Sequence, residues 1–234
     1  MGIYPSALHI RWVSQDFRIA ALAVDEEPWP FWDGGDQDHR VQTWQTKVGW
    51  RPAWGEVSPA GRLNGSSGVS VRDHVLNALG IDIGRAWLTD AVPFFHVHRG
   101  PGTQGAAMSS RYDGFARQHG LPLHNLPDRP STDRLIQYAV EHELGRLRAE
   151  LVDSKASLMI TLGSEALAVA AALGEGDLPL ALSPGGTYGV TCTTRIEGRS
   201  IQVLPLVHPG QRAAAWRAAH DRWLESRAEG QARS

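Results

Sequence analysis

Cysteine is nearly absent from this sequence: among 234 residues there is only Cys192. A single cysteine cannot form a disulfide within the chain. It also cannot supply the several thiolates of a zinc or iron–sulfur site built on cysteines of this chain. We therefore expect no metal and no other cofactor. A chain without disulfides is typical of a reducing compartment, so we expect a cytoplasmic protein of a bacterial-type cytosol or nucleoid.

Long apolar runs and an excess of basic residues are also missing. No run approaches the roughly 20 apolar residues that cross a bilayer, so we expect no membrane partner. The first residues lack the basic segment and apolar core of a secretory signal. The formal net charge is −2, so the whole chain is not attracted to nucleic acid. Any contact with DNA must therefore come from a local patch.

Apolar residues make up 42% of the chain, which is enough for a full core. No stretch rich in Pro, Gly or Ser separates two periodic regions. We therefore predict a single domain over residues 1–234, with the last residues as candidates for disorder.

Strand-like runs alternate with helical spacings along the chain. This alternation predicts an α/β protein whose parallel or mixed sheet is covered on both faces. Ligands bind beyond the carboxyl ends of the strands in such sheets, so we expect the site at 89–92, 163–164 and 208–210. Helices are expected at 69–79, ending at Gly80, at 131–152, with Ser131 as the N-cap, and at 164–173 and 211–227. Strands are expected at 8–13, 18–24, 85–92, 157–162, 187–193 and 200–207, the last two as a hairpin about Glu197-Gly198, and long irregular loops at 25–63 and 93–130.

Five short segments occur in the order in which one family carries them. The first is the turn Gly2-Ile3-Tyr4-Pro5, and the last is the strand end His208-Pro209-Gly210. Between them lie a glycine-rich stretch (65–68), a strand ending in Thr-Asp-Ala-Val (86–92) and a Leu-Gly-x-x-Ala segment (160–166). Together they resemble the motifs of the uracil-DNA glycosylase superfamily. The three middle segments are similar to those of its family 4 branch, without that branch's iron–sulfur cysteines.

The resemblance implies both a fold and an activity. The fold is a three-layer α/β/α sandwich with a central, mostly parallel sheet. The activity is that of a monomeric DNA glycosylase, which flips uracil out of DNA and hydrolyses its glycosidic bond, initiating base excision repair. Uracil-containing DNA is then the partner, and uracil is the product. Two alternatives stay open: a glycosylase for another deaminated base, such as hypoxanthine or xanthine, and a DNA- or nucleotide-binding protein on the same fold that has lost catalysis.

Four residues are the candidates for catalysis and for contact with the base. His208 is expected to donate a hydrogen bond to the base's O2, where negative charge develops, although a core or capping histidine is the plain alternative. Ile3 and Tyr4 stand where the family carries the Asp, Asn or Glu that positions the attacking water. Asp90 stands where the family reads the base with Asn.

Asp90 has three possible roles. A protonated carboxyl would match the N3–H and O4 of uracil, whereas a carboxylate would repel O4. Asp90 could instead hold the attacking water, for which His9 and a backbone carbonyl of the first motif are other candidates. The third role is that of a strand-end aspartate capping a turn.

The remaining candidates concern the flipped base and the DNA backbone. Leu63 stands near the place of the aromatic residue that stacks on the base in family 4. His96 and His98 have the spacing of a metal pair, but no third ligand is evident, so we expect a loop that faces DNA. The aromatic residues Trp29, Trp32, Trp44, Trp50 and Trp54 are expected to pack the first long loop. The candidates for DNA binding are Ser6, Ser66, Ser67, Ser164, Gln211 and Arg212.

Overall fold

The computed structural model describes residues 1–26, 32, 34–61, 66–100, 103–124, 126–211 and 213–232. They form two compact units, each of which we describe by itself. Both contain helices and strands, so the predicted mixed α/β class is confirmed. The single domain stays a prediction, because compact units with interleaved segments need not fold separately. Unit 1 consists of Met1–Ile3, Val69–Val92 and Ser131–Ser234, and unit 2 of Tyr4–Gly68 and Pro93–Pro130.

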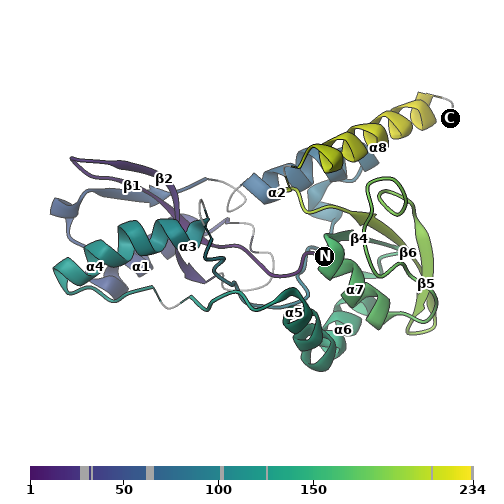
Figure 1. Ribbon diagram of the computed structural model, residues 1–234, viewed down its shortest axis with the longest axis horizontal. Helices are drawn as coiled ribbons and strands as arrows, with labels where there is room; N and C mark the ends of the chain where they lie inside the picture. The colour runs from purple at the N-terminus through teal and green to yellow at the C-terminus, as the bar shows by residue number, and fades with distance from the viewer. Residues whose placement is uncertain are drawn as a thin grey trace. The chain divides into compact units, whose positions relative to one another are not determined.

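Unit 2 contains an antiparallel sheet of three strands in the order β2-β1-β3 (Figure 1). In the central strand Ile10 and Trp12 are buried while Arg11 and Val13 are exposed, which is the alternation of a strand with one face on a core. The two N-terminal strands predicted from the sequence are therefore confirmed. The bounds are β1 (Ala7–Val13), β2 (Arg18–Glu26) and β3 (Glu56–Pro59).

The two segments predicted as long irregular loops contain regular structure, so that prediction was wrong. In the first, Val41, Trp44 and Val48 are buried at helical spacing, but the polar residues between them hide the pattern. This helix ends at Gly49, whose φ of 70° is the left-handed conformation of many helix ends. The additional elements are α1 (Gln37–Val48), the 3₁₀ turn Pro52–Trp54, β3, α3 (Gln104–Ala107), the π-helical segment Met108–Tyr112 and α4 (Asp113–His119).

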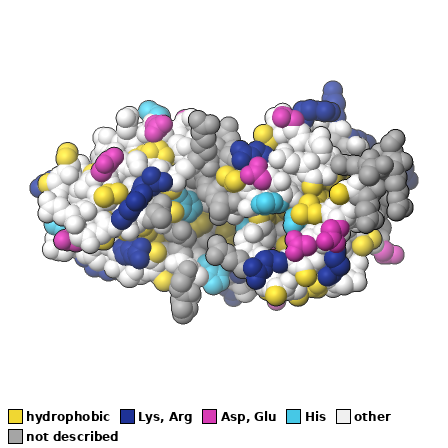
Figure 2. Space-filling view, turned by 90° about the horizontal axis from the view of Figure 1, so that it is seen from above, with side chains coloured by type: hydrophobic (Ala, Val, Ile, Leu, Met, Phe, Trp, Pro, Cys, Tyr) yellow, Lys and Arg dark blue, Asp and Glu magenta, His cyan; other side chains and the backbone are white. Residues whose placement is uncertain are grey.

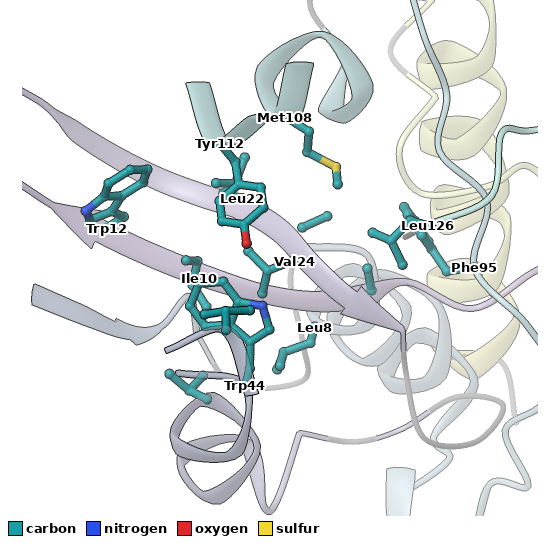
Figure 3. Packing of buried hydrophobic residues seen from close by; sticks show 14 of the residues in the cluster. Leu8, Ile10, Trp12, Leu22, Val24, Trp44, Phe95, Met108, Tyr112 and Leu126 are labelled. Atoms are coloured by element: carbon teal, nitrogen blue, oxygen red, sulfur yellow. The ribbon is translucent and has the colours of Figure 1, made fainter. Parts of the chain in front are cut away.

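Aromatic and aliphatic side chains fill the core of unit 2. Figure 3 shows side chains of β1 and β2 packed with Trp44 of α1 and with Met108 and Tyr112 of the π-helical segment. Trp50 packs against the same cluster and Trp32 is only 2% exposed, so their predicted packing role is confirmed. Trp29 lies outside the described residues.

A buried hydrogen bond between side chains ties α4 to the segment that follows it in unit 2. Asp113 Oδ1 lies 2.7 Å from His124 Nδ1, and the side chains are 6% and 5% exposed. Arg99 Nη2 lies 3.3 Å from the other ring nitrogen, Nε2. Because a guanidinium can only donate, Nε2 accepts, and the ring proton is on Nδ1 facing Asp113.

We expect Asp113→Ala to lower the free energy of unfolding by about 2–3 kcal/mol, because it leaves the buried Nδ1–H of His124 without an acceptor. Asp113→Asn keeps an accepting oxygen and should lose clearly less. Urea unfolding measures both variants. Asp73→Ala, which breaks the exposed Arg72–Asp73 pair, is the control and should leave the midpoint unchanged. If Asp113→Ala and Asp73→Ala lowered the free energy of unfolding equally, the buried contact would have no special role in stability.

The sheet of unit 1 is mixed. β4 (Leu158–Leu162) runs parallel to β6 (Arg199–Leu206), which pairs antiparallel with β5 (Cys192–Ile196). The predicted hairpin is confirmed: Glu197 and Gly198 have φ of 48° and 73°, as tight two-residue turns require. The strand predicted at 187–193 was misplaced, because the chain becomes extended only from Cys192.

Residues 1–3 continue this sheet beyond β4. The amine of Met1 donates to Ile160 O at 2.7 Å and Leu162 N–H donates to Met1 O at 3.0 Å, which is the pattern of parallel neighbours. On the other side Gly2 forms a parallel bridge with Asp90, and Val92 N–H donates to Ile3 O at 2.8 Å. The segments therefore lie in the order 89–92, 1–3, β4, β6, β5.

The buried strand predicted at 85–92 is confirmed only in its last residues. Ile83–Arg85 is a 3₁₀ turn, Trp87 is 54% exposed, and the pairing begins at Thr89. Among the described residues, β1 pairs only with β2 and β3. The strand predicted at 8–13 therefore does not extend the sheet of unit 1, and the neighbour of β4 on this side is the segment 1–3.

Two helical segments cover one face of the β4–β6 pair. Val75, Trp223 of α8 and Leu204 of β6 belong to one buried cluster. The first segment confirms the helix predicted over 69–79, although it begins at Ser66; it ends at Gly80, whose φ is 66°. In Figure 1 α8 lies with it on one side of the strands. The bounds are α2 (Ser66–Val71), the π-helical segment Arg72–Leu76, the 3₁₀ turn Asn77–Leu79 and α8 (Ala214–Ala232).

A second set of helices includes α7 (Ser164–Leu173), which packs against β4 and adds no residue to that cluster. The Ser131 hydroxyl accepts from Arg134 N–H at 3.4 Å, so the predicted N-cap is confirmed. The helix that it opens runs on to Ser154, close to the predicted end, in three segments: α5 (Thr132–Tyr138), the π-helical segment Ala139–Glu143 and α6 (Leu144–Ser154).

Candidate functional site

Three of the four parallel segments in unit 1 carry a polar side chain at or just after their carboxyl ends. Asp90 lies at the end of 89–92, Ser164 follows β4, and His208 follows β6. Ile3, at the end of 1–3, is half-buried and its oxygen accepts from Val92 N–H. The segments at which we expect the site therefore end at one edge of the sheet, which carries Ile3, Asp90, Ser164 and His208.

His208 has a defined protonation pattern. Its Nδ1 accepts from the backbone N–H of Gly210 at 3.0 Å. A neutral imidazole carries one proton, so the proton is assigned to Nε2, which becomes the donor. Although the residue is exposed as a whole, loss of hydration lowers the pKa of the ring, and the nearby carboxylate of Glu165 acts against this. At neutral pH the ring can therefore present an N–H without carrying a charge.

Asp90 is buried, with 4% of its surface exposed, and its carboxyl lies over Gly2. A Cβ atom at position 2 would overlap Asp90 Oδ1, so glycine is the residue that fits beside this carboxyl in its present orientation. The structure thus gives a reason for the glycine that begins the first motif. It also brings a carboxyl group onto that motif from the neighbouring strand.

Sequence reasoning missed two charged residues at this edge. Arg146 of α6 donates from Nη2 to the backbone oxygen of Asp90 at 2.9 Å. Glu165, in the first turn of α7, accepts from the Thr132 hydroxyl at 3.3 Å. Its negative charge acts to raise the pKa of His208. Arg146 stands in no motif, and Glu165 occupies a variable position of the Leu-Gly-x-x-Ala segment; each lies in a helix, where a charged side chain usually indicates only a solvated face.

The candidates for DNA contact in unit 1 make local hydrogen bonds. Ser164 Oγ accepts from Leu182 N–H at 3.3 Å, and its hydroxyl proton can still be donated to another group. Gln211 Oε1 accepts from Ala213 N–H at 3.1 Å, just before α8. Arg212 and Leu63 lie outside the described residues, and so does the side chain of Ser66.

Tyr4, Ser6, Ser67 and His9 belong to unit 2 and are described apart from Asp90 and His208. The ring of Tyr4 meets His96 edge-on at 5.5 Å, and the Arg129 guanidinium lies 6.0 Å from its centre. Ser6 and Ser67 are half-buried. His9 Nδ1 lies 2.6 Å from Ala7 O and donates to it.

His96 does not face outward, so its assignment to an exposed DNA-facing loop was wrong. It is 7% exposed, and burial lowers its pKa, with the backbone of Asp128 acting in the opposite direction. Neither ring nitrogen has a partner that meets hydrogen-bond geometry. Among the described residues, no three His, Cys, Asp or Glu side chains gather as a metal site.

Charge is mixed on the face drawn in Figure 2, where Lys and Arg side chains lie among Asp and Glu side chains. This arrangement agrees with the net charge of −2, and DNA would have to be held by local groups. Within the described part of the chain, no helix is long and apolar enough to cross a membrane.

Comparison with known proteins adds no relative. The chain matches no family model, no curated protein and no solved structure. The resemblance to the uracil-DNA glycosylase superfamily therefore stays a prediction from the sequence motifs.

Proposed function

We propose that this protein is a monofunctional DNA glycosylase that flips uracil out of DNA and hydrolyses its glycosidic bond. The observation that carries the proposal is His208, which follows β6 and has Nδ1 engaged by Gly210 N–H, so that Nε2–H is available to a ligand. A neutral donor at the carboxyl edge of parallel strands suits a leaving base whose O2 gains negative charge.

The proposed reaction breaks the bond between the sugar C1′ and the base nitrogen. The bonding electrons leave with the base, and the sugar becomes oxocarbenium-like, as in glycoside hydrolysis generally. Water then adds to C1′ and loses a proton to solvent, and the uracil anion takes up a proton from solvent and departs as uracil. His208 Nε2–H stabilises the leaving base without transferring its proton. Such a preorganised donor typically contributes about 3–4 kcal/mol.

The water has no carboxylate or amide from residues 3 and 4 to hold it. Asp90 is the acidic group closest to the first motif, because its carboxyl lies over Gly2. Dissociative departure of the base needs a positioned water more than a strong base. We therefore propose a functional enzyme that is slower than one with an acidic first motif.

For the fold we propose the three-layer sandwich of this superfamily. It is supported by the segment order 89–92, 1–3, β4, β6, with all four segments parallel. The separation of helices supports it further: α8 shares a buried cluster with β6, whereas α7 packs on β4 outside that cluster.

We expect the purified protein to create alkali-labile sites at uracil in DNA with EDTA present, because no step uses a metal. Oligonucleotides that each hold one uracil, hypoxanthine, xanthine or mismatched thymine are incubated with protein and then cleaved with alkali. A thymine-only duplex of the same sequence is the control. Uracil oligonucleotides that stay intact with excess protein would overturn the proposal, and binding without cleavage would indicate a protein that has lost catalysis.

Asp90 favours a second candidate, a glycosylase for hypoxanthine or xanthine. These purines present a different order of donors and acceptors from uracil, and a carboxylate can only accept. Faster cleavage at hypoxanthine or xanthine than at uracil in the same experiment would select this candidate.

A further inference from the structure

Arg146 holds the end of the strand that carries Asp90. Its Nη2 donates to the backbone oxygens of Asp90 at 2.9 Å and Ala91 at 3.2 Å. Its Nη1 reaches the Thr89 hydroxyl at 3.3 Å. One guanidinium thus contacts three consecutive residues at the carboxyl edge of the sheet, and its planar fork suits such a set of oxygens.

The charge of Arg146 is taken up by two glutamates of its own helical stretch. Nε donates to Glu143 at 2.7 Å and Nη1 to Glu150 at 2.6 Å. Burial acts to lower the pKa of Arg146, but these two contacts outweigh it and raise the pKa above its ordinary value. Arg146 donates to the main-chain oxygen of Asp90, so it acts on Asp90 chiefly through geometry rather than by attracting its carboxylate.

The same strand end is held on its opposite edge by the first motif. Ala91 N–H donates to Gly2 O at 3.0 Å, and Val92 N–H donates to Ile3 O at 2.8 Å. The backbone at Asp90 is therefore fixed from both sides. An aspartate side chain has only two rotatable bonds, so the position of its carboxyl follows the backbone closely.

We propose that Arg146 is a positioning residue for base recognition: by fixing residues 89–91, it sets where the Asp90 carboxyl meets the base at the carboxyl edge of the sheet. This inference rests on the proposed glycosylase function. It makes selectivity between bases depend on a helical arginine that need not touch the base.

The test compares Arg146→Lys with Arg199→Lys. Arg199 also lies in unit 1 and donates to two backbone oxygens, Leu151 O at 3.1 Å and Ala156 O at 2.9 Å. Lysine keeps the charge at both positions and removes the fork. We expect similar losses of thermal stability in the two variants, because each loses one arginine fork to the main chain.

The two variants should differ at the site. Arg146→Lys is expected to lower kcat/KM for the preferred base about 10-fold or more, since misplacement by about 1 Å can cost 10²-fold. In Arg146→Lys the ratio of kcat/KM for the preferred base to kcat/KM for the second-best base should fall as well. Arg199→Lys should keep both values within twofold. Amide hydrogen exchange at Ala91 and Val92 should quicken in Arg146→Lys alone, a readout that needs no activity.

Unchanged selectivity in an active Arg146→Lys, or equal changes in both variants, would overturn the positioning role and leave the glycosylase proposal intact. A wild-type protein that excises no base removes the proposed function, and the role at a base falls with it. The exchange rates then still show whether Arg146 holds the strand end.

Discussion

Replacing His208 with alanine is expected to lower uracil excision by about 10²-fold or more, the scale for losing one transition-state donor. DNA binding should change little, because the Nε2–H acts on charge that appears only as the bond breaks. Single-turnover rates and a fluorescence binding assay measure the two quantities. His142→Ala is the matched control: this histidine also lies in unit 1, its side chain is 56% exposed, and its loss should leave the rate unchanged.

The pH dependence gives a second readout for His208. Loss of hydration lowers the pKa of the His208 ring below its ordinary value, so the ring is neutral at neutral pH. Below that pKa, protonation of Nδ1 removes the acceptor for Gly210 N–H, and we expect excision to fall. His208→Ala should lack this acidic decline. An excision rate of His208→Ala within threefold of the wild-type rate would indicate that His208 has only a structural role.

Asp90→Asn is expected to keep uracil excision and to lose the decline at high pH. If Asp90 reads the base as a neutral acid, the wild type must slow as the carboxyl ionises, because carboxylate repels O4. The amide reproduces the donor and the acceptor and does not titrate in this range. One pH–rate profile of each protein, with a melting curve, measures the effect.

The same experiment separates the other two roles of Asp90. If the carboxylate holds the attacking water, the wild-type rate rises with pH through its ionisation, and Asp90→Asn is clearly slower. If Asp90 only caps a turn, Asp90→Asn has normal kinetics and reduced stability. Asp82, whose carboxylate accepts from Gly84 N–H at 2.7 Å, is a capping aspartate of the same unit. Asp82→Asn therefore shows what a purely capping role looks like. Unchanged pH dependence in Asp90→Asn excludes both catalytic roles.

Short-range signals in the sequence predicted much of unit 1. Ser131 as an N-cap, Gly80 as a helix end and the Glu197-Gly198 turn are local features, because each depends on one residue and its neighbours. The carboxyl edge with Asp90 and His208 followed from the order of strands and helices.

Features set by distant parts of the chain were missed. Arg146 has glutamates at positions −3 and +4, a spacing that also describes an ordinary solvated helix face. The sequence around Arg146 does not indicate that its side chain contacts Thr89 and Ala91. Helix α1 was missed for a different reason: only three buried side chains mark it within a polar stretch.

The close approach of Gly2 and Asp90 means that these two positions cannot vary independently. Any side chain at position 2 occupies the space that the Asp90 carboxyl now fills. A chain that gains a residue larger than glycine at position 2 must therefore turn the Asp90 carboxyl out of its present orientation, accept a smaller residue at position 90, or separate the two segments. Correlated substitution at 2 and 90, rather than invariance of either alone, is the pattern that this packing imposes on any divergence or redesign of the chain.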